Sequence, residues 1–153
     1  MQAIELKVPP VAVVAVIAVL MWAASRFFTV ASFPFQGAAI VAFAVALIGG
    51  GIAVAGVFAF RRHSTTVNPM KPETTESVVT AGIYGVTRNP MYLGLAIVLV
   101  GWAVYLANLA ALLMVPVFVA YMTRFQIRPE ERALLAKFGS DFAAYMASVR
   151  RWI

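Results

Sequence analysis

Two short polar segments hold most of the side chains in this sequence that are suited to chemistry. The first is Arg88-Asn89-Pro90, which follows a stretch containing Gly82 and Gly85. The second is the acidic pair Glu130-Glu131, which follows Arg128. Glycine allows a backbone to approach a ligand closely, a guanidinium binds carboxylates through paired hydrogen bonds, and carboxylates bind cations or transfer protons. We therefore take these two segments as the candidate site.

Each segment also has a purely structural interpretation, which the residues alone leave open. Two acids at the start of a helix complement the helix dipole, and a proline suits the first turn of a helix. An arginine beside an apolar run is typical of the cytoplasmic boundary of a membrane protein. A site is favoured because the glycine-bearing stretch, the Arg-Asn-Pro helix start and the acidic pair are all expected on one face.

Several kinds of site are disfavoured by what the sequence lacks. The chain has no cysteine and a single histidine, His63, so neither thiolate chemistry nor a histidine-based metal centre is expected. A net charge of +6 suits nucleic-acid binding when the basic residues form a patch. Here they flank apolar runs instead, which is the pattern of membrane insertion, so we expect no nucleic-acid partner.

The composition indicates that the bilayer is the solvent of this chain. Its 153 residues are 63% hydrophobic and 12% charged, with a mean hydropathy of +0.90, whereas soluble domains are about half apolar and a quarter charged. Four apolar runs approach the length of about 20 residues that spans a bilayer; they cover 8–24, 37–60, 91–107 and 109–125. We predict an all-α, polytopic membrane protein with four transmembrane helices, a cytoplasmic loop and an amphipathic C-terminal helix, in a single domain over 1–153. An alternative for the first run is a signal peptide, which Glu5 and two prolines disfavour.

The basic residues predict how these runs are oriented. All 12 Lys and Arg except Arg26 fall on the side that holds the amino terminus, the 61–90 loop and the carboxy-terminal tail. Because cytoplasmic loops are enriched in Lys and Arg, we expect both termini to be cytoplasmic, in an inner or plasma membrane.

Glycine and proline predict local features of the helices. Pro116 should kink the fourth run, and Gly49-Gly50-Gly51 with Gly56 should permit close helix contact. Gly139 should divide the tail helix. The tail also carries an apolar stripe at helical spacing that should lie back against the bundle, formed by Leu134, Phe138, Phe142, Tyr145 and Val149. Trp152 is expected as an interfacial anchor.

Five motifs together resemble the superfamily of isoprenylcysteine carboxyl methyltransferases and phospholipid methyltransferases. They are Thr65-Thr66-Val67-Asn68-Pro69, Thr80-Ala81-Gly82-Ile83-Tyr84, Arg88-Asn89-Pro90-Met91-Tyr92-Leu93-Gly94, Pro129-Glu130-Glu131-Arg132-Ala133-Leu134 and Phe138-Gly139-Ser140-Asp141-Phe142-Ala143-Ala144-Tyr145. Their order and spacing make the combination specific. The resemblance covers about 56–152, and the first apolar run carries no mark of the family.

The resemblance implies a membrane-embedded enzyme that binds S-adenosyl-L-methionine between residues 61–94 and 124–152. It implies methyl transfer to a lipophilic small molecule or lipid that arrives from the bilayer. The catalytic candidates are Arg88, Arg128, Glu130 and Glu131. The cofactor-binding candidates are Gly82, Tyr84, Gly85, Asn89, Pro90, Tyr92, Glu130 and Glu131. Within this analogy an arginine would hold the methionyl carboxylate, a tyrosine would face the sulfonium, and an acid would bind the ammonium or the ribose.

Two positions depart from the family pattern. Asn89 stands where the family often has histidine, and an amide forms hydrogen bonds but does not titrate. Gln126 stands where the isoprenylcysteine branch commonly has arginine. This weakens the isoprenylcysteine interpretation because a carboxylate acceptor needs a cation, so amine, carboxylate and thiol acceptors all stay open, as does the oligomeric state.

Two other functions remain as alternatives. Membrane sterol reductases share related carboxy-terminal elements and would bind NADPH there, although they generally have more spans. A non-catalytic membrane subunit would keep the fold without the chemistry.

For the methyltransferase, we expect the acceptor to reach the site near the third and fourth runs. The opening would be a gap created by Pro116 and by the small residues Gly94, Ala96 and Gly101.

Overall fold

The computed structural model describes residues 5–62 and 78–153, and within these ranges the chain is helical and contains no strand. The Thr65–Pro69 motif lies outside the described residues. In chain order the elements are α1 (Pro10–Phe27), the 3₁₀ turn η2 (Thr29–Ala31), α2 (Ala38–Arg62), the 3₁₀ turn η4 (Gly82–Gly85), α3 (Pro90–Leu106), α4 (Leu109–Leu112), α5 (Met114–Met122), the π-helical turn η5 (Thr123–Ile127) and α6 (Arg128–Ser148). The expected all-α class is confirmed.

Three helical runs are long and apolar enough to cross a membrane by length and composition. They are Pro10–Phe27, Ala38–Ala59 and the run Leu109–Ser148. Only the first part of the last run is apolar, because charged residues recur from Arg124 onward. The third expected span, 91–107, corresponds to α3, which is a shorter apolar helix of 17 residues.

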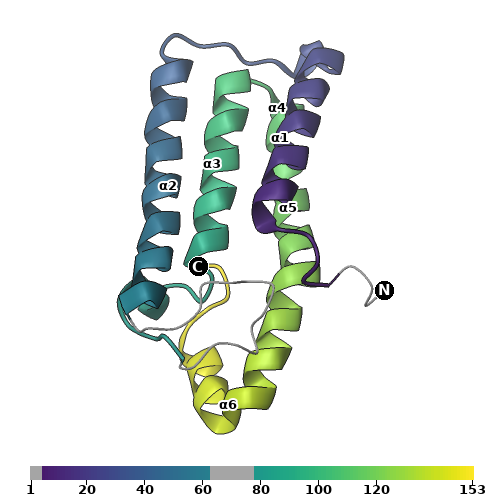
Figure 1. The fold of residues 1–153 in the computed structure, drawn as a ribbon. Coiled ribbons are helices and arrows are strands. Elements are labelled where there is room, and N and C mark those ends of the chain that lie inside the picture. Colours follow the sequence, from purple (N-terminus) through teal and green to yellow (C-terminus); the bar gives the residue numbers. More distant parts are fainter. Residues whose placement is uncertain (1–4, 63–77) are drawn as a thin grey trace.

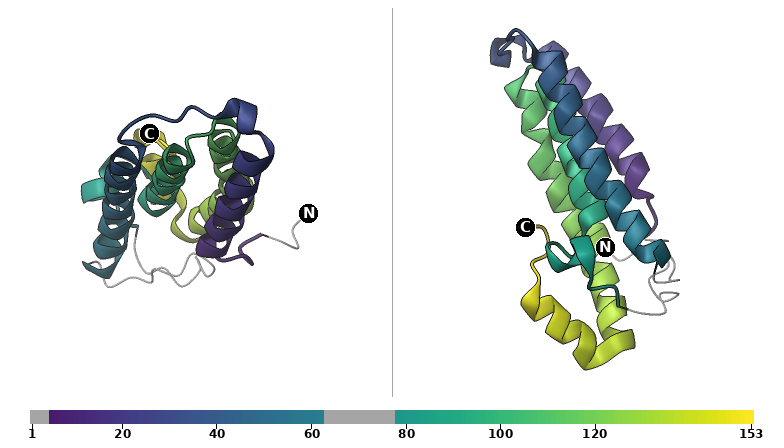
Figure 2. Two further views of the ribbon diagram at one scale, coloured as in Figure 1. Left: turned by 90° about the horizontal axis from the view of Figure 1, so that it is seen from above. Right: turned by 90° about the vertical axis from the view of Figure 1, so that its left-hand side faces the viewer.

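α3 lies at the centre of the bundle, with α2 on one side and α1 with α4–α5 on the other (Figure 1, Figure 2). Large apolar side chains of α1 and α2, such as Val19 and Ile40, face outward and are exposed, as expected for helices surrounded by lipid. The buried core lies between α1, α3 and α5 and includes Met21, Leu99, Phe118 and Met122.

Glycine brings α2 and α3 into backbone contact. A Cβ on Gly49 would lie 2.6 Å from the carbonyl oxygen of Gly94, and one on Gly101 would lie 2.9 Å from that of Ala42. A side chain at either position would force the helices apart. The predicted close contact is confirmed at Gly49 and Gly56. The expected gap at Gly94 and Gly101 is wrong, because α2 fills the space beside both residues.

Two prolines interrupt the last helical run because proline has no N–H to donate. Pro116 cannot bond to the carbonyl of Leu112, and the α-helix is interrupted at Leu113, between α4 and α5. Pro129 cannot bond to the carbonyl of Phe125, and that oxygen accepts a hydrogen bond from the backbone N–H of Leu6 (3.1 Å). The π-helical turn η5 is therefore hydrogen-bonded to the segment that precedes α1.

The tail folds back on itself at Gly139. Its backbone angles there (φ 53°, ψ −123°) are non-helical and suit glycine, so α6 is divided as predicted. The second half of α6 turns back toward the membrane part, and the chain end reaches the start of α3 (Figure 1, Figure 2). Trp152 is partly buried: its indole Nε1 donates to the Thr123 hydroxyl (3.1 Å), and its ring packs against the core. Its role as an interfacial anchor stays a prediction.

Candidate functional site

A cavity of about 60 Å³ lies where η4, the start of α3 and both halves of α6 meet. Its lining joins residues far apart in the sequence: Val78, Val79, Tyr84, Arg88, Asn89, Met91, Tyr92, Ile127, Glu130, Glu131, Leu134, Phe142 and Tyr145. The polar lining residues come from the start of α3 and the first turn of α6, and the aromatic ones mainly from η4 and the folded-back half of α6.

Glu130 is the carboxylate that faces this cavity. The Tyr92 hydroxyl donates a hydrogen bond to its Oε2 (3.2 Å). Burial raises the pKa of Glu130 to about 7, and the hydrogen bond from Tyr92 opposes that rise. A carboxyl with a pKa near neutrality can both bind a cation and exchange a proton, and such groups concentrate at functional sites.

Two tyrosines join η4 to the second half of α6. The Tyr145 hydroxyl donates to the backbone carbonyl of Tyr84 (2.8 Å), and both residues are buried. Burial also raises the pKa of Tyr84, with the nearby Glu130 adding to the effect. The phenols are therefore neutral and serve as hydrogen-bonding and aromatic surfaces.

Glu131 is bound by two arginines. Arg151 donates from Nε to Oε1 (3.0 Å) and from Nη2 to Oε2 (2.7 Å), and this pairing raises the pKa of Arg151. Arg88 Nη1 lies 3.2 Å from Glu131 Oε1 as an ion pair. The Arg88 side chain is 11% exposed, and its Nε has no hydrogen-bond partner among the described residues.

The last residues of the chain also hold the start of α3 through their backbone. The backbone N–H of Arg88 donates to the carbonyl of Arg150 (3.0 Å), and the Asn89 side-chain amide donates to the carbonyl of Arg151 (2.9 Å). The chain end thus fixes the segment that carries Arg88.

The structure brings together six of the residues predicted for the site, all in the cavity lining: Tyr84, Arg88, Asn89, Tyr92, Glu130 and Glu131. Gly82 and Gly85 shape η4, where Gly82 has φ +62°, and buried Pro90 begins α3; none of the three lines the cavity. Arg128 is exposed and lies outside the lining. The roles of all these residues stay predictions.

Sequence reasoning missed Arg151 and gave no site role to Phe142 and Tyr145. The helical spacing of the two aromatics predicted that they pack against the bundle, and they do so over the cavity. Nothing in the sequence indicated that Arg151, the third residue from the carboxyl end, returns to Glu131.

A second hollow of about 250 Å³ adjoins the cavity, with which it shares two lining residues. Its lining is apolar and comes from α1, α2 and α3: Pro10, Val11, Ala53, Val54, Val57, Met91, Tyr92 and Leu95. Val11 and Val54 are exposed, so the hollow opens onto the surface of the bundle. Met91 and Tyr92 line both spaces.

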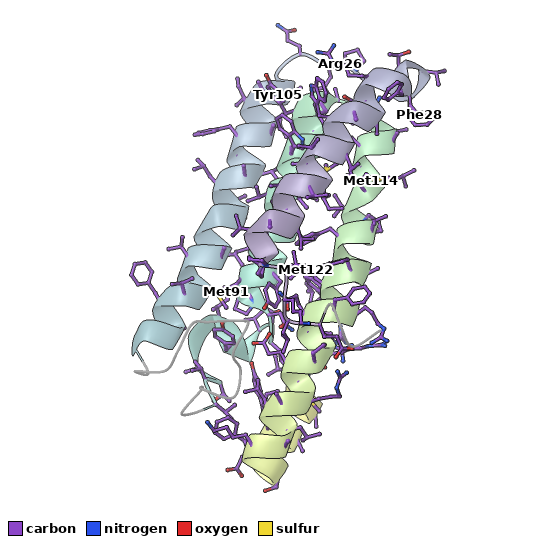
Figure 3. The ribbon with its side chains drawn as sticks, turned by 45° about the vertical axis from the view of Figure 1, so that its right-hand side comes forward. Arg26, Phe28, Met91, Tyr105, Met114 and Met122 are labelled. Atoms are coloured by element: carbon purple, nitrogen blue, oxygen red, sulfur yellow. The ribbon has the colours of Figure 1, made fainter. Side chains whose placement is uncertain are left out.

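This arrangement suits a reaction between a polar molecule and an apolar one. Met91 lies near the start of α3, far from Tyr105 and Phe28 at the other end of the bundle (Figure 3). A polar ligand in the cavity and an apolar chain in the hollow would meet at Met91 and Tyr92.

Comparison with known proteins gives the family of this chain. The sequence model of the phospholipid methyltransferase family matches residues 38–141, which include most of the elements that line the cavity. An uncharacterized protein of Haemophilus influenzae is 41% identical over 63 residues, which is 41% of this chain and all of that protein. No solved structure matches the chain. Because the match covers well over half of the sequence, the chain belongs to the phospholipid methyltransferase family.

Proposed function

We propose that this protein uses S-adenosyl-L-methionine to methylate an amphipathic acceptor at the cytoplasmic face of the membrane. The observation that carries the proposal is the wall shared by the two spaces. Tyr92 and Met91 separate a cavity with arginine and carboxylate groups from an apolar hollow. This is the arrangement that a charged methyl donor and a lipid-like acceptor require.

The groups in the cavity fit the chemistry of the cofactor. Its amino acid part has a carboxylate, for which Arg88 offers a buried Nε without a partner among the described residues. Its ammonium or ribose hydroxyls would find an acceptor in Glu130, and Tyr92 and Tyr84 offer aromatic surface for a sulfonium. When bound, the cofactor supplies a methyl group on positive sulfur.

The residues of this chain would act mainly by binding and by excluding water, which is the help that an in-line displacement needs. Arg88 holds a carboxylate, Glu130 holds a cation or takes a proton from the acceptor, and Phe142 with Tyr145 covers the site. A cavity of about 60 Å³ is below the roughly 300 Å³ of small-molecule pockets. Binding would therefore move the second half of α6, for which Gly139 is the natural hinge.

The acceptor proposal places an apolar chain in the hollow between α1, α2 and α3. Val54→Phe should fill part of this hollow, raise KM for a lipophilic acceptor and leave cofactor affinity unchanged, which is the signature of lost ground-state binding. Val41→Phe, on the exposed surface of α2 but outside the hollow, is the matched control. An equal KM in both variants would contradict this position for the acceptor.

We further propose that the chain forms a single membrane domain over 1–153 with both termini cytoplasmic. In this domain α3 also crosses the membrane, so that there are four spans. The contact of Leu6 with Phe125 supports a shared side for the start of α1 and the tail. Single cysteines at Gln36 and Ser148 in this cysteine-free chain test the orientation. An impermeant thiol reagent outside intact cells should label position 36 only, and labelling of position 148 alone would reverse the topology.

Thermal unfolding with two cofactors tests the function itself. A ligand at a hundredfold its Kd adds about 2.7 kcal/mol of stability, so S-adenosyl-L-methionine should raise Tm and NADPH should not. Stabilisation by NADPH alone would favour a reductase. Stabilisation by neither would favour a non-catalytic subunit.

A further inference from the structure

We propose that Arg151 is a positioning residue that keeps Arg88 available for a ligand by occupying Glu131. The inference rests on the proposed function, in which Arg88 binds the carboxylate of S-adenosyl-L-methionine. It assigns a task to the end of the chain that goes beyond holding the fold together.

The geometry of the three charged side chains carries the inference. Arg151 meets both oxygens of Glu131 with Nε and Nη2 at 3.0 and 2.7 Å, the paired arrangement in which guanidinium binds carboxylate best. Arg88 contributes only Nη1, at 3.2 Å from Oε1 and without hydrogen-bond geometry. Glu131 is thus satisfied by Arg151, and Arg88 keeps its Nε uncommitted beside the cavity.

Removal of the Arg151 side chain would change that balance. The Glu131 side chain is only 14% exposed, and a buried carboxylate without partners is costly. Arg88 is the other guanidinium already in contact with Glu131, so it would turn to pair with both oxygens. The same donors would then be lost to the ligand.

The substitution isolates this effect because the backbone contacts of the chain end do not depend on the Arg151 side chain. The carbonyls of Arg150 and Arg151 accept from the Arg88 N–H and from Asn89, and both carbonyls persist in Arg151→Ala. Arg150 gives a matched control, since it is the adjacent arginine and is exposed.

The test is calorimetric binding of S-adenosyl-L-methionine to the detergent-solubilised full chain. We expect Arg151→Ala to raise Kd about tenfold, the effect of losing roughly one good hydrogen bond to a charged group, and Arg150→Ala to leave Kd unchanged. Arg151→Lys, which keeps the charge without the paired geometry, should fall between them. The decisive variant is Glu131→Gln with Arg151→Ala, because it removes the group that would capture Arg88. Its Kd should return to that of Glu131→Gln alone.

A merely structural role predicts the opposite for the double variant. If Arg151 only stabilises the fold, a second substitution should leave Kd as high as in Arg151→Ala or raise it further, and that result would overturn the inference. An unchanged Kd in Arg151→Ala would overturn it as well. If the wild-type protein bound no S-adenosyl-L-methionine, the proposed function itself would be wrong. If the wild type bound it but the variants did not behave as described, only the role of Arg151 would be wrong.

Discussion

α3 is held in place by two different kinds of contact. Along α2, the contact is backbone against backbone through Gly49, Gly94 and Gly101, with Ala42 and Ala53 completing it. At the start of α3, the contact is made by ion pairs and hydrogen bonds that reach Glu131 and the end of the chain. The first interface is too tightly packed to adjust. The second consists of charged and polar groups that could form hydrogen bonds with a ligand instead of with one another.

The difference indicates a division of tasks along one helix. The glycine contact fixes α3 as a scaffold within the membrane part. The polar contacts at its start place Arg88 and Tyr92 against α6, which is divided at Gly139. Substitutions in the first interface should therefore affect stability, and substitutions in the second should affect binding.

The largest effect should come from breaking the glycine contact. Gly94→Leu would drive a side chain into the backbone of Gly49 and Ala53. Severe overpacking of this kind lowers the free energy of unfolding by about 3 kcal/mol or more. We expect a large fall in Tm or failure to purify as a folded protein. Gly50→Leu is the control, because a Cβ there meets nothing within 4 Å, and its Tm should stay close to wild type. Equal behaviour of the two variants would contradict the packing account.

The next effect concerns the polar side of α3. Arg88→Ala should weaken cofactor binding by about ten- to a hundredfold, because a hydrogen bond to a charged group contributes roughly 1.5–3 kcal/mol. Arg128→Ala removes a guanidinium that is exposed and outside the cavity lining, so its Kd should not change. Calorimetry on both variants decides whether Arg88 binds the ligand or serves only as a basic residue at the membrane boundary.

The pattern of glycines and prolines predicted the scaffold well, because each of these residues acts through its own backbone. The helix contact at Gly49, the interruption near Pro116 and the division at Gly139 all follow from local chemistry. The family motifs likewise predicted six of the residues that line the cavity. Arg151 could not be predicted, since its contact with Glu131 exists only once the Gly139 turn brings the chain end back. The hollow between α1, α2 and α3 was also missed, because it depends on how three helices diverge.

A smaller effect should appear in the dependence of stability on pH. The folded state holds the proton of Glu130 up to a pKa of about 7, above its ordinary value of 4.5. Between these values the folded protein binds more protons than the unfolded chain, so stability falls as the pH rises through this window and levels off above it. Thermal unfolding from pH 4.5 to 8 should show this decline in the wild type. Glu130→Gln should lack that component, and an identical pH profile in both proteins would contradict a buried, titrating Glu130.

The smallest effect should come from the hydrogen bond that holds the chain end to η5. Thr123→Val removes the acceptor of the Trp152 indole N–H, and we expect a loss of about 1 kcal/mol. Ser25→Ala removes a hydroxyl that is exposed and bonds only within α1, and it should have no measurable effect. Chemical denaturation of the two variants gives the comparison. If Ser25→Ala lowered the free energy of unfolding as much as Thr123→Val, the chain-end contact would contribute no more to stability than an exposed hydroxyl.

We propose that the polar cavity and the apolar hollow form one site for methyl transfer. The most direct test of this proposal is incubation of the purified protein with S-adenosyl-L-methionine carrying a labelled methyl group and a membrane lipid extract, followed by phase separation. We expect label in the lipid phase with the wild type, and much less with Arg88→Ala and Val54→Phe. Label that appeared only in water-soluble products, or equally with all three proteins, would contradict it.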